Sequence, residues 1–170
     1  LNGIYQRILN QAGVTIFEGH GQVLGGGKVS VGETVLTARH ILVAVGGKPF
    51  VPDLPGREHV RISDDLFYLD TLPKRVAVVG GGYIATEFAG ILHGLGCQVT
   101  QVYRGDLFLR GFDQDIREFI AEQMKEQGVT LKFNADVASI EAINGEKHVT
   151  YQGGEQAVFD EVFYATGRIP

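Results

Sequence analysis

The sequence RVAVVGGGYIATE, residues 75–87, decides the fold of this 170-residue chain. A short apolar run typical of a buried strand is followed at once by three glycines and then by a segment with helical spacing. Glycine permits the tight turn with which a strand leads directly into a helix. We therefore expect a strand at 75–79 and a helix at 83–93, ended by the glycines at 94 and 96.

The same alternation continues towards the C-terminus. Two crossover helices between three strands indicate a parallel sheet with right-handed connections. The expected elements are a strand at 98–103, a helix at 113–127 with Ile116, Phe119, Ile120 and Met124 on its apolar face, and a strand at 129–133.

Strand patterns return after the third strand. Residues 137–143 and 147–151 flank Asn144-Gly145, which is typical of the turn in a β-hairpin. A further strand is expected at 162–165.

Residues 1–49 have a different pattern. A helix ends near residue 12, and short apolar segments divided by glycines follow. We interpret them as an antiparallel meander that leads into a buried strand, with strands expected at 14–17, 28–31, 34–37 and 41–45. Pro49, Pro52 and Pro55 then indicate an extended connection, which we interpret as a domain boundary.

The composition excludes several classes of protein. Apolar residues make up 44% and charged residues 21%, as in a globular protein. The net charge of −5 disfavours nucleic acid or an anionic membrane as a main partner, and no apolar run reaches the roughly 18 residues of a membrane-spanning helix. The single cysteine, Cys97, excludes an internal disulfide, and we expect it to be a small buried side chain. The five histidines lack ligand spacing, so no metal site is predicted.

Gly80, Gly82 and Ala85 form the pattern G-x-G-x-x-A, which is typical of sites that bind the pyrophosphate of a dinucleotide. Gly80 would allow the turn, Gly82 would let the pyrophosphate approach the backbone, and Ala85 would let the helix pack against the sheet. The helix N-terminus would present free N–H groups to the anion. The alternative is a structural glycine turn in another α/β domain, and the strand–turn–helix context favours the dinucleotide.

The end of the second strand indicates which dinucleotide is bound. NAD sites have a carboxylate about 20 residues after the fingerprint. Here the strand ends in Tyr103-Arg104, and Asp106 lies beyond it in the loop. Arg104 and Arg110 together predict recognition of the 2′-phosphate of NADPH, because guanidinium groups pair well with phosphate. Arg110 alone would be interpreted as a solvated surface charge.

Over its whole length the chain resembles the glutathione reductase branch of the flavin-dependent disulfide reductases. The motifs that carry the resemblance are the fingerprint, Arg104 with LRGFD at 109–113, IYQ at 4–6, GHG at 19–21, HILVAVGGKP at 40–49 and ATGRIP at 165–170. The resemblance implies an α/β fold: a Rossmann-like FAD/NAD(P)-binding domain with a parallel sheet plus an antiparallel β-meander. It also implies a division into a remnant of the FAD domain at 1–49, an NADPH-binding domain at 50–164 and a return into the FAD domain at 165–170.

The resemblance further implies roles for single residues. NADPH would be bound by Gly80, Gly81, Gly82, Tyr83, Ile84, Glu87, Arg104, Arg110, Gly167 and Arg168. Within this set Tyr83 would be the gate of the nicotinamide pocket, and Glu87 would be the acid near nicotinamide that pairs with a lysine of the flavin domain. FAD would contact the backbone of Gly21, Ala44 and Gly46, and Tyr5 would touch glutathione disulfide. Without the resemblance, a packing role explains Tyr83 equally well. A favourable interaction with the helix dipole likewise explains Glu87 equally well.

The implied parent enzyme is a cytoplasmic homodimer that passes hydride from NADPH to FAD and electrons onward to a cysteine pair and glutathione disulfide. This chain has neither a cysteine pair nor a His-Glu couple, so by itself we expect it to hold NADPH without reducing a disulfide. Two departures from the family are Val45, where Thr is usual, and Gly105, where a third basic residue or His often strengthens NADPH preference. A segment of a dihydrolipoamide- or mercuric-type reductase and a stand-alone dinucleotide-binding module remain alternatives.

Overall fold

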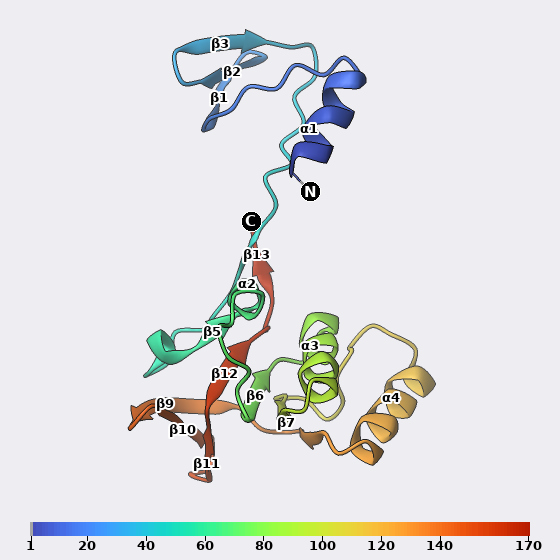
Figure 1. Cartoon of the computed structure of the whole chain (residues 1–170), viewed down its shortest axis with the longest axis vertical. Coiled ribbons are helices and arrows are strands. Elements are labelled where there is room, and N and C mark those ends of the chain that lie inside the picture. Colours follow the sequence, from blue (N-terminus) through green and yellow to red (C-terminus); the bar gives the residue numbers. More distant parts are fainter. Residues whose placement is uncertain (1) are drawn as a thin grey trace. The chain divides into compact units, whose positions relative to one another are not determined.

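The structure, a computed structural model, describes residues 2–170. It divides into two compact units, Leu1–Val45 and Gly46–Pro170 (Figure 1). No helix within the described residues is long and apolar enough to cross a membrane.

The N-terminal unit contains a helix, α1 (Asn2–Gln11), and a three-stranded antiparallel sheet in the order β1-β2-β3. The helix ends as predicted, since Gly13 adopts a left-handed φ of 76° that suits a glycine after a helix. The strands are β1 (Gly21–Gly25), β2 (Lys28–Val31) and β3 (Thr34–Thr37). The meander is therefore confirmed for the predicted strands at 28–31 and 34–37.

Two predicted strands of this unit are wrong. Within the described residues, 14–17 and 41–45 form no strand, whereas 21–25 does. The expected burial of 41–45 is also wrong, because Leu42 and Val45 are 88% and 86% exposed. Apolar β-branched sequence favours an extended chain, but a strand also needs a neighbour to complete its ladder of hydrogen bonds, and none of the described residues pairs with 41–45.

The C-terminal unit is built on a five-stranded parallel sheet in the order β5-β12-β6-β7-β8. Helix α3 connects β6 to β7, and α4 connects β7 to β8, which confirms the predicted crossover units (Figure 1). Its strands are β5 (Arg61–Ile62), β6 (Arg75–Val79), β7 (Gln98–Val102), β8 (Thr130–Lys132) and β12 (Glu161–Tyr164), and its helices are α2 (Ser63–Leu66), α3 (Tyr83–Gly94) and α4 (Gln114–Glu126).

Helix α3 packs on one face of the parallel sheet, and a second, antiparallel sheet in the order β11-β10-β9 covers the opposite face. The predicted hairpin is confirmed: Asn144 and Gly145 both have a positive φ, of 52° and 86°, as its two-residue turn requires. The strands are β9 (Val137–Ile143), β10 (Glu146–Tyr151) and β11 (Gln156–Phe159).

Alternate side chains of β6 pack on opposite faces of the parallel sheet. Val76 and Val78 pack against α3, whereas Ala77 and Val79 pack against the antiparallel sheet. This period of two explains why a short unbroken apolar run forms a strand buried on both faces. Cys97 is 3% exposed and packs in the helix-side core, which confirms its predicted role as a small buried side chain.

The predicted apolar face of α4 is partly wrong. Ile116 and Phe119 are 50% and 59% exposed, and Ala121 is the buried residue of this helix. Ile120 and Met124 do pack against the core. The buried face is shifted because Arg117 points inward and donates to the carbonyl oxygens of residues 107 and 108. A pattern of apolar residues cannot predict that a charged side chain faces inward.

The two ends of the C-terminal unit meet in a short antiparallel ladder of β4 (Lys48–Pro49) and β13 (Arg168–Ile169). The Phe50 N–H donates to the Gly167 oxygen at 2.9 Å, and the Thr166 hydroxyl donates to the Phe50 oxygen at 2.9 Å. A 3-10 turn, η1 (Arg57–His59), lies between β4 and β5. Residues 46–49 and 165–170 thus form one compact unit with 50–164, and their assignment to a flavin domain stays a prediction.

Candidate functional site

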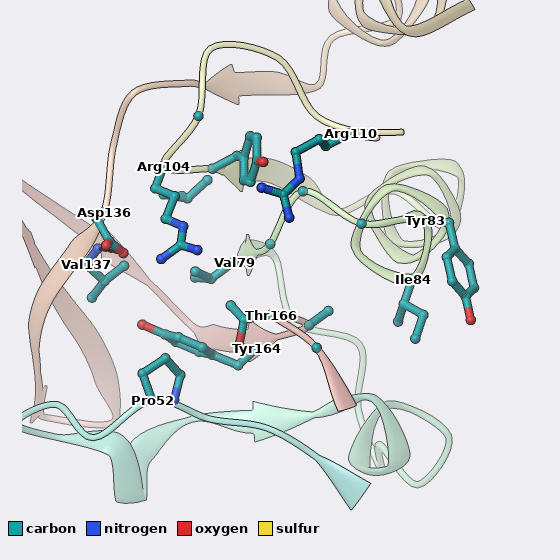
Figure 2. Close-up of a pocket in the computed structure, with 18 of the residues that line it drawn as sticks. Pro52, Val79, Tyr83, Ile84, Arg104, Arg110, Asp136, Val137, Tyr164 and Thr166 are labelled. Carbon is teal, nitrogen blue, oxygen red and sulfur yellow. Dashed lines mark hydrogen bonds between the residues drawn. The ribbon is translucent and has the colours of Figure 1, made fainter. Parts of the chain in front are cut away.

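A cavity of about 880 Å³ opens at the carboxyl ends of β6, β7 and β12 (Figure 2). The chain runs from β6 to β7 on one side of this point and returns as β12 on the other. Open α/β sheets bind their ligands at such a reversal of strand order. The sheet topology therefore supports a ligand site independently of any motif.

Most of the predicted NADPH-binding residues line this cavity, namely Gly80, Gly81, Gly82, Tyr83, Ile84, Arg104, Arg110, Gly167 and Arg168. Glu87 lies one turn further along α3 and does not line it, nor does Gly46. Gly21, Ala44 and Tyr5 belong to the N-terminal unit, where Tyr5 is an exposed residue of α1.

Gly80 and Gly82 differ in what a side chain at each position would meet. Gly80 has a φ of 149°, and a Cβ there would collide with the Ala165 backbone oxygen and approach the Ala85 Cβ to 3.1 Å. A Cβ on Gly82, which has an ordinary φ of −89°, would meet nothing within 4 Å and would point into open space. Gly80 is therefore needed by the fold, while Gly82 keeps the space beside the helix N-terminus clear.

The glycine turn, residues 80–82, has bonded carbonyl oxygens and free N–H groups. The Gly81 oxygen accepts from the Leu109 N–H at 2.6 Å, and the Gly82 oxygen accepts from the Thr86 N–H at 3.1 Å. Among residues 2–170, the backbone N–H groups of 81–84 donate to no backbone oxygen. Unpaired donors at a helix N-terminus attract anions such as phosphate.

The arginine loop, residues 104–112, carries two free guanidinium groups. Arg104 and Arg110 are exposed, and within residues 2–170 neither forms an ion pair. Figure 2 shows both guanidinium groups pointing into the cavity, whereas the Tyr83 ring points away from them. The structure thus brings Arg104 and Arg110 together as the sequence predicts, with their charges available to an anion.

The backbone of the arginine loop is firmly held. Phe108 is fully buried, and Leu109 adopts a left-handed φ of 56°, which costs a non-glycine residue of order 1–3 kcal/mol. Arg117 donates to the Phe108 oxygen at 2.7 Å and to the Leu107 oxygen at 2.6 Å. The loop therefore presents Arg110 from a fixed backbone.

Asp106, Asp136 and Tyr164 line the cavity but were not predicted as site residues. Asp106 and Asp136 also line the cavity, so three arginines face two aspartates there. Burial raises the pKa of the nearly inaccessible Tyr164, and the charge of Asp136 raises it further, so its phenol stays protonated. Arg168 donates to the Gly47 oxygen. Only the strand order brings Asp136 and Tyr164 here, and no local pattern indicates it.

Two other kinds of site find no support in the described residues. They contain no group of three or more His, Cys, Asp or Glu side chains arranged to hold a metal ion. Burial raises the pKa of the Cys97 thiol, so this side chain is a poor nucleophile.

The parallel sheet, its crossover helices and the glycine turn define a Rossmann-like α/β fold of the FAD/NAD(P)-binding type. The chain belongs to the pyridine nucleotide-disulphide oxidoreductase family, whose model matches residues 1–170.

The curated proteins that this chain resembles include glutathione reductases. Those of Burkholderia cepacia and of Nostoc sp. (strain PCC 7120) are each 42% identical over 170 and 172 residues, covering all of this chain and 38% of each relative. The chloroplastic/mitochondrial glutathione reductase of Pisum sativum is 42% identical over 171 residues, which make up 31% of its length. The chain thus spans about a third of the length of these relatives, and the match fits an internal segment of a glutathione reductase.

A solved structure shows the same fold. The HOCl-induced flavoprotein disulfide reductase RclA from Escherichia coli superposes with a TM-score of 0.86 at 29% identity, over 98% of this chain and 40% of that one.

Proposed function

We propose that the cavity of the C-terminal unit binds NADPH, and that the chain is part of a flavin-dependent glutathione-disulfide reductase. One observation carries the proposal. The guanidinium groups of Arg104 and Arg110, which form no ion pair within residues 2–170, lie in the same cavity as the free N–H groups of the glycine turn. A dinucleotide with a phosphorylated ribose carries both of the anions that these groups match.

The residues present suit this cofactor. The N–H groups of 81–84 would bind the pyrophosphate, and the open space beside Gly82 would admit it. Arg104 and Arg110 would hold the 2′-phosphate. A charged hydrogen bond contributes about 1.5–3 kcal/mol, so each arginine should account for about 10- to 100-fold in NADPH affinity.

The roles of the remaining predicted residues rest on the family. Arg168 and Gly167 would lie near nicotinamide, Tyr83 would cover its pocket, and Glu87 would act on the same end of the cofactor through a lysine. Gly21, Ala44 and Gly46 would contact FAD, which in the parent enzyme passes electrons from NADPH to a cysteine pair, and Tyr5 would touch glutathione disulfide. We extend the same proposal to a homodimeric, cytoplasmic parent enzyme.

A calorimetric titration of the full chain with NADPH and with NADH tests the cofactor. We expect NADPH to bind more tightly, and replacement of both Arg104 and Arg110 by Ala to weaken NADPH by about 100-fold or more while NADH changes less than about twofold. Lys74→Ala is the matched control, since Lys74 is an exposed cation at the opposite end of the sheet. Tighter binding of NADH, or equal losses for both cofactors, would contradict the proposal.

A further inference from the structure

Gln101 is a fully buried polar side chain in the middle of the parallel sheet. Among the described residues it is the one buried side chain that is neither apolar nor aromatic. It lies in β7 two residues after Val99 and so faces α3. Its amide nitrogen Nε2 donates to the Gly80 oxygen at 3.1 Å and to the Thr86 hydroxyl at 3.2 Å.

Thr86 extends this contact to the other end of the glycine turn. Its hydroxyl accepts from Gln101 and donates its own proton to the Gly82 oxygen at 3.2 Å. Each proton in the chain Gln101–Thr86–Gly82 thus has one acceptor, and both protons of the Gln101 amide are used.

The orientation of the Gln101 amide follows from these partners. The Gly80 oxygen can only accept, so the amide nitrogen and not the amide oxygen must face it. The amide oxygen Oε1 is consequently buried without a partner within the described residues. An unpaired buried oxygen destabilises the folded chain, so an apolar residue would serve the strand better. The amide is therefore best explained by what it does to the glycine turn.

The bonds fix the direction of two peptide groups. In a trans peptide the C=O and the following N–H point in opposite directions. Because the Gly80 oxygen faces Gln101, the Gly81 N–H faces away from it; because the Gly82 oxygen faces Thr86, the Tyr83 N–H faces away from the helix. Gly81 and Tyr83 line the cavity, and neither N–H donates to a backbone oxygen among residues 2–170.

We propose that Gln101, acting through Thr86, is a positioning residue that holds the glycine turn ready to donate to the pyrophosphate of a dinucleotide. The inference rests on the proposed function of this cavity and deepens it. Donors that are oriented before binding need no rearrangement when the anion arrives, which raises affinity. Because pyrophosphate is common to both cofactors, Gln101 acts on NADPH and NADH alike, unlike the arginines.

The test compares three variants of the full chain by calorimetric titration with NADPH and with NADH. Gln101→Met and Thr86→Val remove the donors at nearly constant volume, and Thr86→Ser is the matched control that keeps the hydroxyl. We expect Gln101→Met and Thr86→Val to lower the affinity for both cofactors by about 10-fold. The affinity of Thr86→Ser should stay within about twofold of that of the unchanged chain. Melting temperatures should change by less than about 5 °C.

Amide proton spectra supply a readout that a purely structural role would leave unchanged. On addition of NADPH, the Gly81 and Tyr83 resonances should shift in the unchanged chain and in Thr86→Ser, and shift much less in Gln101→Met at equal saturation. Near-normal affinity of Gln101→Met and Thr86→Val for both cofactors would overturn the inference and leave the proposed function standing. Failure of the unchanged chain to bind either cofactor would overturn both.

Discussion

The glycine turn and the arginine loop face the same cavity, and hydrogen bonds hold the backbone of both, but they present different groups to it. In the glycine turn the backbone N–H groups are the proposed donors to a ligand, and the carbonyl oxygens accept hydrogen bonds from Gln101, Leu109 and Thr86. In the arginine loop the backbone accepts hydrogen bonds from Arg117, and the groups proposed to bind a ligand are free side chains. Under the proposed function, the cavity would combine a rigid site for the part that all dinucleotides share with adjustable charges for the part that distinguishes them.

The largest loss of stability and binding should come from replacing Gly80, which the glycine turn needs for its shape. Gly80→Ala forces a Cβ against the Ala165 backbone in a conformation that L-residues avoid. We expect a loss of about 3 kcal/mol in unfolding free energy, together with loss of binding of both cofactors. Urea denaturation and titration of the same samples measure the two effects. Unchanged stability would mean that the turn is less rigid than its hydrogen bonds indicate.

Gly82→Ala should separate binding from folding in the same turn. Its Cβ meets no atom of the protein and its φ suits any residue, so unfolding free energy should change by less than about 0.5 kcal/mol. The methyl group would stand where pyrophosphate approaches, and both NADPH and NADH should bind about 10-fold more weakly. If affinity holds while stability falls, Gly82 belongs to the fold and not to the ligand site.

Arg117→Met should loosen the arginine loop without touching the ligand. It removes the donors to the Leu107 and Phe108 oxygens and keeps the length of the side chain. We expect NADPH affinity to fall about fivefold, because Arg110 is then less well placed, while NADH affinity stays the same. Equal losses for NADPH and NADH would show that the loop supports the whole cavity.

Asp160→Asn should affect stability alone. Asp160 accepts from the backbone of Lys74 and Arg75 and from the Arg75 guanidinium, at the opposite end of β6 from the cavity. The hydrogen bond from Arg75, with the backbone N–H groups, holds the Asp160 pKa below its ordinary value of 3.8. We expect the unfolding free energy to fall by about 1 kcal/mol near pH 7 and the affinity for either cofactor to stay unchanged.

The pH dependence of that loss has a definite sign. The stabilisation by the Asp160 carboxylate is complete above its ordinary pKa and is lost as pH falls through the lower pKa of the folded state. The difference in melting temperature between the two proteins should therefore shrink as the pH falls below 3.8. A constant difference down to pH 2 would assign the effect to packing instead of charge.

Local patterns predicted the elements of the C-terminal unit closely. The strand at 75–79 and the helix at 83–94 form within a residue of expectation, because an apolar run, a glycine cluster and helical spacing act within neighbouring residues. The same holds for the turn at Asn144-Gly145, where backbone conformation alone selects the residues.

What the patterns missed depends on partners distant in sequence. The position of β12 beside β6 brings Tyr164 to the cavity, and the inward turn of Arg117 exposes Ile116, yet neither leaves a periodic signal. Residues 41–45 look like a strand and pair with none of the described residues. Of the site, Arg104 and Arg110 were predicted because charge beside a fingerprint is visible in sequence. Gln101 was missed because its partners, the Gly80 oxygen and the Thr86 hydroxyl, lie on other elements, 21 and 15 residues away.

If the cavity binds NADPH as proposed, the hydrogen bond from the Leu109 N–H to the Gly81 oxygen limits how its coenzyme preference could be re-engineered. A loop transplanted from an NADH-using relative would have to keep its length up to residue 109. A change of length would distort the glycine turn and abolish binding of either cofactor. Position 109 would also have to avoid valine and isoleucine, because β-branched residues are the least compatible with the left-handed backbone that Leu109 adopts. Exchange of the two arginine side chains on an unaltered main chain is thus the more promising route.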